Sequence, residues 1–452
     1  MSPISEEMFK AYDIRGVYPT EVNSEVIYAI GQAYAQLFSP RTVVVGHDVR
    51  TSGPELYHAL IEGLTDAGVD VVRIGGISTE MMYFAVGYYG YGGGLTVTAS
   101  HNPAEYNGLK MVKKHAEPVT GETGIFAMRD LIPKLLKQPV RHSAKGVVSD
   151  EDIFQDYRSF LFKFVDPRKF QPMTVVVNAN FGLQGKFASQ VLAGTPVRLS
   201  LLNSEPDGTF PKGRPDPFVP ENRDEFVAKI VAERPDFGVA WDADADRCFF
   251  ATGDGTFLEA YYMNAILAQA LLVKHPGEKI IYDVRYTWAI IDAVTKAGGQ
   301  PVKSRVGHSY IKQAMRKNNA FFCGESSGHY YFRDYFYSDT GMLPFLFVIQ
   351  LLSDSGKSLA DFAQPLLEKY FVSGEINSKV NDVENVLARV KEQYRNATAI
   401  DETDRLSIEY GRDWRANIRS SNTEPLLRLN VEAASERLME EKRDELLALI
   451  RG

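Results

Sequence analysis

The chain has 452 residues, a formal net charge of −8 and a sequence pI of about 5.6. This length exceeds what one hydrophobic core usually serves, so three or four domains are expected. The negative net charge argues against a broad nucleic-acid-binding surface. If the substrate is an anion, its binding site must contain a local concentration of positive charge.

The N-terminus and the cysteine content favour a cytoplasmic protein. Met1–Phe9 has no apolar core and contains two glutamates, unlike a signal peptide. The longest apolar run, Met342–Leu352, is too short to span a bilayer. Cys248 and Cys323 are the only cysteines, so no disulfide framework is expected. We therefore expect a cytoplasmic enzyme for small molecules, without a nucleic-acid or membrane partner.

One strand–helix–strand pattern occurs three times along the chain. Each copy begins with an apolar strand, continues into a helix that ends at an Ala-Gly pair, and returns in a second strand. The glycine suits the left-handed residue that closes many helices. The copies comprise Thr42–Val45, Ala67-Gly68 and Val69–Ile74; Thr174–Val177, Ala193-Gly194 and Val197–Leu202; and Lys279–Tyr282, Ala297-Gly298 and Val302.

Each copy leads to a third strand, at Leu95–Thr98, Phe237–Trp241 and Ala320–Cys323, followed by a loop of polar side chains. Such patterns also arise by chance, but the matching position of the loops favours three similar α/β domains with mixed sheets and flanking helices. Their loops are expected to converge on one central cleft.

The pattern ends near residue 370, and a smaller α+β domain is expected to follow. Its last helix is amphipathic, with Leu438, Leu446, Leu449 and Ile450 on one face. The basic, polar segment Lys134–Ser149 indicates a crossing between the first two domains. The expected domains are 1–148, 149–255, 256–370 and 371–452.

The first polar loop contains Ser100, which follows the apolar run Leu95–Thr98. Asn102-Pro103 predicts a turn that ends this strand. Ser100 therefore lies at a strand end, where α/β proteins usually place functional residues. Lys110 is expected to lie within reach of Ser100 across the loop. Ser100 is therefore either a serine in a polar turn or a nucleophile that accepts a phosphoryl group, and this motif alone leaves both open.

The second loop contains Asp242, Asp244 and Asp246, which would project to one side of an extended segment. Carboxylates held about 5 Å apart repel by roughly 3 kcal/mol per pair at an effective dielectric constant near 20. A cation relieves this repulsion, and oxygen ligands select Mg²⁺, Mn²⁺ or Ca²⁺. A calcium EF-hand does not fit, because Arg247 and Gly253 stand where it needs glycine and glutamate. The flanking apolar strands argue against a merely solvated acidic turn.

The third loop, after Cys323, offers a carboxylate, hydroxyls and an imidazole. Glu325 and Ser327 can each bond the neighbouring hydroxyls of a sugar. His329 and His308 are candidate proton carriers, with a structural role as the alternative.

A fourth polar run, Arg419–Pro425, combines an arginine with hydroxyl and amide donors that can surround a phosphate. Taken alone, this run also fits a plain turn before a proline.

Together with an N-terminal motif, these loops resemble the α-D-phosphohexomutases, the family of phosphomannomutases and phosphoglucomutases. The motifs, in family order, are Phe9–Gly16, Thr98–Pro103, Asp242–Arg247, Gly324–His329 and Arg419–Pro425. The resemblance covers nearly the whole chain. It implies four domains around a deep cleft, with Mg²⁺ as cofactor and hexose phosphates as substrates.

The resemblance also implies roles for individual residues. Ser100 is the implied phosphoserine and, with Asp242, Asp244 and Asp246, the implied Mg²⁺ ligand. The other candidate catalytic residues are Arg15, His101, Lys110, which is also a candidate proton carrier, and Arg247. The candidate substrate-binding residues are Arg285, His308, Glu325 and Ser327 at sugar O3 and O4, His329, and Arg419, Ser421, Asn422 and Thr423 around the phosphate that is not transferred.

The implied reaction interconverts hexose 6-phosphate and hexose 1-phosphate through a phosphoserine and a hexose 1,6-bisphosphate, which also acts as activator. Asp283–Trp288 and Tyr330–Asp334 resemble the phosphomannomutase branch, so mannose is expected. Arg285 and Ser326 depart from the pattern of some relatives and leave glucose open as well. The alternatives are a phosphoglucosamine mutase, a metal-dependent sugar-phosphate phosphohydrolase or a non-catalytic phosphosugar-binding protein. A monomer or small homo-oligomer is expected.

Overall fold

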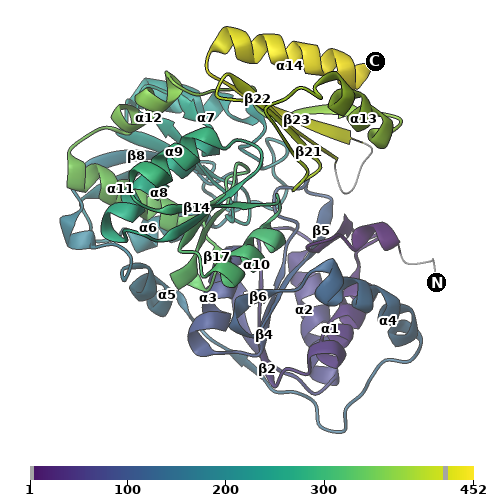
Figure 1. The fold of residues 1–452 in the computed structure, drawn as a ribbon. Helices are drawn as coiled ribbons and strands as arrows, with labels where there is room; N and C mark the ends of the chain where they lie inside the picture. Colours follow the sequence, from purple (N-terminus) through teal and green to yellow (C-terminus); the bar gives the residue numbers. More distant parts are fainter. Residues whose placement is uncertain (1–4, 421–425) are drawn as a thin grey trace. The chain divides into compact units, whose positions relative to one another are not determined.

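The computed structural model describes residues 5–420 and 426–452 (Figure 1). The described chain forms two compact units, each made of two sequence segments. The first unit contains the described residues up to Phe257 together with His329–Gly356. The second contains Leu258–Gly328 together with Lys357–Gly452. The four domain boundaries expected from the sequence stay a prediction.

The first unit begins with a mixed sheet and its helices, drawn in purple to blue in Figure 1. The strands are β1 (Ile14–Val17), β2 (Thr42–His47), β3 (Asp70–Gly76), β4 (Gly93–Val97), β5 (Tyr106–Lys113), β6 (Glu117–Pro118) and β7 (Val148–Asp150). The helices are α1 (Ser24–Phe38), α2 (Gly53–Asp66), α3 (Thr79–Tyr89) and α4 (Phe126–Lys137). The strand order is β1-β5-β4-β2-β3-β7, with β6 paired to β5. Strand β2 is parallel to β3 and β4, whereas β5 is antiparallel to β1 and β4. The end of the expected crossing segment thus forms β7, which pairs with β3.

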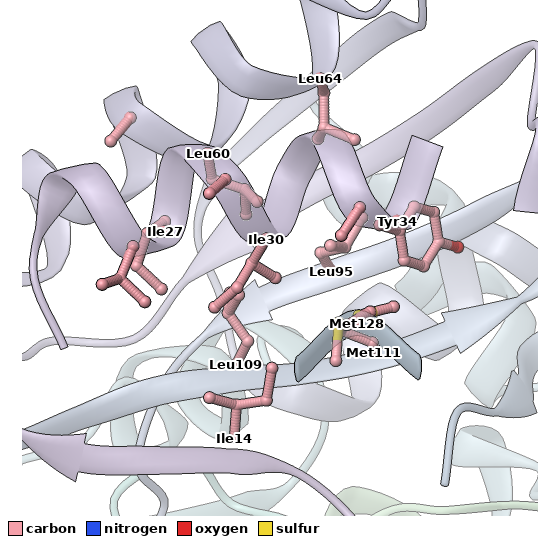
Figure 2. Packing of buried hydrophobic residues seen from close by; sticks show 14 of the residues in the cluster. Ile14, Ile27, Ile30, Tyr34, Leu60, Leu64, Leu95, Leu109, Met111 and Met128 are labelled. Carbon is pink, nitrogen blue, oxygen red and sulfur yellow. The ribbon is translucent and has the colours of Figure 1, made fainter. Parts of the chain in front are cut away.

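A continuous apolar core fixes the strands that lead to Ser100. Figure 2 shows side chains of α1 and α2 packed over strands β4 and β5. Ile27, Ile30 and Tyr34 recur every three or four residues of α1, so they share one helix face, and all three are fully buried. Burial of each large apolar side chain contributes roughly 1.5–3 kcal/mol. The end of β4 is therefore held by a well-packed core.

A second sheet has the order β12-β11-β10-β8-β9, of which β12 (Phe257–Leu258) is the edge strand. The other strands are β8 (Met173–Asn178), β9 (Val197–Leu202), β10 (Phe237–Trp241) and β11 (Cys248–Thr252). Helices α5 (Phe154–Leu161), α6 (Gln184–Val191) and α7 (Asp224–Glu233) accompany them. Because β10 is antiparallel to β11, residues 242–247 form the connection between two paired strands.

The segment His329–Gly356 adds β16 (Tyr330–Phe332), β17 (Ser338–Asp339) and α11 (Met342–Ser355) to the first unit. The indole Nε1–H of Trp241 donates to the Gly341 carbonyl at 2.9 Å. This bond joins the end of β10, just before Asp242, to the start of α11.

The second unit begins with three parallel strands in the order β14-β13-β15. They are β13 (Lys279–Asp283), β14 (Gln300–Ser304) and β15 (Phe322–Gly324). Helices α8 (Ala260–Lys274), α9 (Trp288–Lys296), α10 (His308–Asn318) and α12 (Leu359–Leu367) belong to this part. The short strand β12 (Phe257–Leu258) lies where the two units join in the sequence.

The C-terminal part of the second unit is an antiparallel sheet in the order β18-β23-β22-β21-β20, with β19 also paired to β23. The strands are β18 (Phe371–Val372), β19 (Ile376–Lys379), β20 (Ala399–Asp401), β21 (Leu406–Tyr410), β22 (Trp414–Ser420) and β23 (Leu426–Ala433), and the helices are α13 (Val383–Gln393) and α14 (Glu436–Arg451). The four predicted residues of the last helix join its core, Leu446 and Ile450 fully and Leu438 and Leu449 partly buried. The expected α+β fold is confirmed.

The threefold sequence repeat is also confirmed. Gly68, Gly194 and Gly298 follow the helices of the three copies with φ values of +84°, +84° and +76°. L side chains rarely adopt this conformation, which explains a glycine at each position. In the part of the chain that the structure describes, no helix combines the length and apolarity needed to cross a membrane.

Candidate active site

Ser100 lies in the loop that follows β4 and is almost completely buried. Its φ of +50° is left-handed, which is uncommon for a residue with a side chain and indicates a conformation imposed by its surroundings. The hydroxyl Oγ donates to Asp242 Oδ2 at 2.9 Å and lies 3.0 Å from His101 Nδ1. The Ser100 N–H donates to Thr98 Oγ1 at 2.9 Å. The structure thus brings the predicted nucleophile to the predicted metal loop.

Oxygens of Asp242, Asp244 and Asp246 lie within 4.8 Å of one another, and all three residues are buried. The extended conformation assumed from their alternation is wrong. The loop turns instead, with Ala245 at φ +58° and its N–H bonded to the Asp242 carbonyl at 3.1 Å. The carboxylates converge because the backbone curls around them, so the predicted clustering holds for a different physical reason.

The chemistry of this cluster suits a hard cation. Burial, together with Asp246 and Asp244, raises the pKa of Asp242 well above its usual range. Asp244 Oδ1 is buried and has no hydrogen-bond partner among the described residues, although such atoms are normally satisfied. An oxygen-coordinated cation would neutralise the cluster and fill that position.

Lys110, on β5, contacts the acidic cluster itself. Its Nζ donates to Asp244 Oδ2 at 2.7 Å and also to Asp246 Oδ2. Burial alone would lower the pKa of Lys110, but Asp244 and Asp246 outweigh it and raise the pKa. The ammonium is therefore a partial counter-ion of the carboxylates, one of which, Asp244, belongs to the same acidic loop as the Ser100 partner Asp242.

Arg15 and His101 both lie beside the serine loop. The guanidinium of Arg15 donates to Asp13 Oδ2 at 2.6 Å and to Asn102 Oδ1 at 2.9 Å. Burial, followed by the charges of Arg247 and Arg15, lowers the pKa of His101 well below its usual range. A neutral imidazole next to Ser100 Oγ can accept a proton, which suits the predicted catalytic role.

Arg247 and His329 meet at the other side of the acidic loop. The two residues form a β-bridge, and the Arg247 N–H donates to Asp242 Oδ1 at 3.2 Å. His329 Nε2 lies 3.4 Å from Asp246 Oδ1. His329 and Asp246 also group with Asp339 as possible ligands of one metal ion. Both predicted residues therefore belong to the serine and metal region.

The sequence reading missed several residues around this region. Thr79, at the start of α3, donates its Oγ1–H to Asp244 Oδ2 at 2.7 Å and its N–H to the Asp244 carbonyl at 2.9 Å. Asp48 accepts the Thr98 hydroxyl at 2.7 Å, and Arg50 binds the backbone of the serine loop. Asp48 and Arg50 follow the buried strand β2, and this position at a strand end was the available signal.

In the second unit, Arg285 lies at the centre of a buried charged cluster. Its guanidinium donates to both carboxylate oxygens of Asp283, at 3.1 and 3.0 Å, and to Glu325 Oε1 at 3.1 Å. The Ser326 N–H donates to Asp283 Oδ2 at 2.7 Å. Burial disfavours the Arg285 charge, but Asp283 and Glu325 outweigh it and raise the pKa. The structure thus unites the predicted Arg285 and Glu325.

The loop after β15 makes a tight turn in which the Gly328 N–H donates to the Glu325 carbonyl at 3.0 Å. Gly328 has φ +90°, so a side chain there would be strained. Ser327 is half-buried in this turn, and His308, also half-buried, is the first residue of α10.

The Arg419 guanidinium contacts Glu375. The sequence analysis did not identify Glu375. Arg419 Nη2 donates to Glu375 Oε2 at 2.5 Å. Arg428 Nη1 lies 3.5 Å from Glu375 Oε1, and Arg285 Nη1 lies 3.8 Å from Oε2. The predicted Ser421, Asn422 and Thr423 lie outside the described residues. The arginine of the predicted phosphate clamp is thus paired with an internal carboxylate.

Four protein-family descriptions match this chain in order. The "Phosphoglucomutase/phosphomannomutase, alpha/beta/alpha" domains I, II and III match residues 6–134, 154–255 and 259–370, and the "Phosphoglucomutase/phosphomannomutase, C-terminal domain" matches residues 375–449. Together they cover most of the sequence.

Whole proteins show the same similarity. The chain is 43% identical over 451 residues to a phosphomannomutase of Escherichia coli, covering 98% of this chain and 99% of that protein. It is also 43% identical over 449 residues to phosphohexose mutases of Xanthomonas campestris, with 98% and 99% coverage. A solved phosphoglucomutase/phosphomannomutase family protein from Burkholderia thailandensis aligns with a TM-score of 0.87 at 31% identity, covering 99% of this chain and 97% of that one.

Proposed function

Because this chain belongs to the phosphoglucomutase/phosphomannomutase family and is a phosphohexomutase, we propose that phosphorylated Ser100 is the group that exchanges phosphate with the sugar. The observation that supports this most is the Ser100 Oγ bond to Asp242 at 2.9 Å, inside a group of three buried carboxylates. A phosphate there would add a charge of about −1.5 to −2 at pH 7. Such a charge requires the cations that surround the loop.

Mg²⁺ is the proposed cofactor, held by Asp242, Asp244, Asp246 and Ser100 or its phosphate. The buried Asp244 Oδ1 without a hydrogen-bond partner supports a cation at this position. Bound there, Mg²⁺ supplies charge neutralisation to the transferred phosphoryl group. Arg15, Arg247 and Lys110 add positive charge from the chain itself.

We propose the following reaction. The phosphoryl group leaves Ser100 Oγ and bonds to the free hydroxyl of a hexose monophosphate, which gives a hexose 1,6-bisphosphate. The hydroxyl proton passes to a nearby base, for which neutral His101 is the candidate. The Lys110 ammonium can act only as a proton donor, for which the Ser100 oxygen is a candidate acceptor when its phosphoryl group leaves. After the bisphosphate reverses its orientation, Ser100 accepts the other phosphoryl group and the product leaves. The same bisphosphate serves as activator of unphosphorylated enzyme.

Most of the groups proposed to bind the rest of the substrate belong to the second unit. Glu325 and Ser327 are assigned to sugar O3 and O4, with Arg285 and His308 as further contacts, and His329 of the first unit is a further candidate. Arg419, with Ser421, Asn422 and Thr423, is assigned to the phosphate that is not transferred. Planar guanidinium groups suit such phosphates because they donate two parallel hydrogen bonds.

Mannose is the proposed sugar, with glucose accepted as well. The similarity to a phosphomannomutase supports mannose, and a site that binds O3 and O4 need not distinguish the configuration at O2. A phosphoglucosamine mutase is the nearest alternative. We further propose a cytoplasmic monomer or small homo-oligomer, in keeping with Cys248 and Cys323 as buried free thiols.

The test is intact-mass spectrometry before and after incubation with glucose 1,6-bisphosphate, with peptide mapping. We expect one added phosphate on Ser100, its removal by hexose monophosphate, and no labelling or mutase activity in Ser100→Ala. Parallel rates with mannose 1-phosphate and glucose 1-phosphate in Mg²⁺ identify the sugar. Full mutase activity without modification of Ser100 would refute the mechanism, and phosphate release without sugar isomerisation would indicate a phosphohydrolase.

A further inference from the structure

The buried guanidinium of Arg50 makes four hydrogen bonds to the backbone of the serine loop, to which Arg214 Nε adds one at the His101 carbonyl at 3.2 Å. One terminal nitrogen of Arg50, Nη2, donates to the carbonyls of Ser100 and Asn102, both at 2.7 Å. The other, Nη1, donates to the carbonyls of Pro103 at 2.6 Å and Tyr106 at 2.8 Å. Four carbonyls of a seven-residue loop therefore point at one side chain, which is itself completely buried.

Among the basic side chains, only arginine has enough hydrogen-bond donors for this contact. A guanidinium has five N–H groups, and the two terminal nitrogens of Arg50 use four of them on the loop. The fifth, on Nε, faces Asp48 Oδ2 at 3.3 Å. Lysine has three donors on one tetrahedral nitrogen and cannot reproduce this planar arrangement.

Asp48 connects the same arginine to the active conformation of Ser100. The carboxylate accepts the Thr98 hydroxyl at 2.7 Å, and Thr98 Oγ1 in turn accepts the Ser100 N–H at 2.9 Å. The Ser100 backbone is thus held at its N–H through Thr98 and at its carbonyl by Arg50. Between these two contacts the residue has its left-handed φ of +50°, and its Oγ donates to Asp242.

A segment after β9 covers the arginine. The Phe210 ring lies 5.0 Å from the Arg50 guanidinium, and the backbone of Gly208 forms a bridge with Arg50. A Cβ on Gly208 would lie 2.1 Å from the Val49 carbonyl oxygen, so this close approach requires glycine. The cover keeps the guanidinium in a water-poor environment, where its hydrogen bonds to carbonyls are stronger.

We propose that Arg50 is a positioning residue for phosphoryl transfer, a role that rests on the proposed function of Ser100. Its guanidinium fixes the loop from Ser100 to Tyr106 so that Oγ stays aligned for transfer in both directions. Because Arg50 contacts the loop, Asp48 and the covering segment at Gly208 and Phe210, and none of the described residues assigned to the sugar or the second phosphate, its loss should lower the rate of transfer and leave substrate affinity nearly unchanged. A misplacement of about 1 Å in a reacting group can cost about 10²-fold in rate.

The experiment compares full-length Arg50→Lys with wild type and with the matched control Arg73→Lys, whose half-buried arginine on β3 pairs with Asp150. We expect kcat of the mutase reaction to fall about 10²-fold in Arg50→Lys while KM changes less than about threefold. The variant preloaded with glucose 1,6-bisphosphate should lose its phosphoserine to water faster, relative to transfer, than wild type does. The control should match wild type in all three measurements.

Phe210→Leu provides a second, milder test from another segment, because it removes the ring over the guanidinium and retains an apolar side chain. A decrease in kcat of about three- to tenfold at constant KM is expected, in the range of a desolvated cation–π contact. The role of Arg50 is refuted if a folded Arg50→Lys retains kcat within about twofold of wild type. It is equally refuted if Arg50→Lys does not fold and Phe210→Leu leaves both kcat and phosphoserine loss unchanged.

The same experiment separates this role from the proposed function. If wild type itself takes no phosphate on Ser100, the phosphoserine mechanism fails and the effect on kcat has another origin. If wild type is phosphorylated and the variants behave like wild type, only the role of Arg50 fails.

Discussion

Around Asp242, Asp244 and Asp246, three carboxylates lie within 4.8 Å of one another and share the ammonium of Lys110, whereas around Glu375 three arginines surround one carboxylate. The acidic group is buried, whereas around Glu375 the Arg428 side chain is half-buried. The first has three carboxylates to one ammonium, whereas the second is balanced once Asp283 and Glu325 join Glu375 as partners of its arginines. Of these two groups, the acidic one therefore lacks counter-charge, and the charges of the arginine group are already paired.

The two regions differ in whether an added ion would have to displace a protein group. The acidic loop is kept in place by neutral donors such as Thr79 and by Lys110, and a divalent cation can add to it without displacing a protein group from Asp244 Oδ1. Arg419, in contrast, already binds Glu375. If Arg419 binds the second phosphate as proposed, that phosphate must exchange with the carboxylate, and binding in the second region is then a competition.

The largest expected effect comes from Asp244→Asn, which removes charge from the acidic loop and preserves its shape. We expect kcat/KM to fall by about 10²–10³-fold, the range for the loss of one preorganised electrostatic contact in an active site. Mg²⁺ affinity, measured by calorimetry on the protein alone, should weaken in parallel. Asp130→Asn, at a surface ion pair with Arg129 in the same unit, is the control. An unchanged Mg²⁺ affinity in Asp244→Asn would contradict the assignment of this loop.

A smaller effect is expected from Glu325→Gln in the second region. A hydrogen bond to a charged acceptor contributes about 1.5–3 kcal/mol, so kcat/KM should fall by about 10- to 100-fold. Arg285 retains its two bonds to Asp283, so the loop should keep its structure. Mg²⁺ affinity should remain at the wild-type level. Equal loss of Mg²⁺ binding would show that the two regions do not act separately.

Local patterns predicted most of the fold and the positions of the key loops. The apolar run Phe237–Trp241 matches β10 residue for residue, and the glycine after each repeated helix has the left-handed conformation that its type suggested. These features depend on neighbours in sequence, and the chemistry of one stretch is enough to indicate them. Ser100 was placed correctly at a strand end for the same reason.

The residues that the sequence analysis did not identify make contacts between positions far apart in the sequence. Thr79 contacts Asp244, 165 residues later, and Arg419 contacts Glu375, 44 residues earlier. Neither Thr79 at a helix start nor Glu375 before a short strand differs locally from ordinary capping or surface residues. The curled acidic loop was mistaken for an extended one because alternating residues fit both shapes until the left-handed Ala245 is known.

The smallest effect on catalysis is expected from Glu375→Gln, which tests the proposed competition directly. Burial would raise the pKa of Glu375, but Arg419, Arg285 and Arg428 outweigh it and lower the pKa below its ordinary value. Removing the charge leaves Arg419 without a carboxylate to exchange, so KM for hexose phosphate should fall by about threefold, equivalent to about 0.6 kcal/mol. A higher KM would instead mean that Glu375 orders the arginines for the phosphate.

The stability of the same variant should depend on pH with a defined sign. A carboxylate whose pKa is lowered in the folded state stabilises the fold above its unfolded pKa of about 4.3, and this contribution is lost as pH falls through the folded pKa. The difference in unfolding free energy between wild type and Glu375→Gln should therefore be largest above about pH 5 and shrink below about pH 4.3. Urea unfolding at several pH values measures it, and a difference that grows toward acid pH would contradict the ion-pair assignment. Because the substitution leaves Asp242, Asp244 and Asp246 unchanged, Mg²⁺ affinity should not follow this pH dependence.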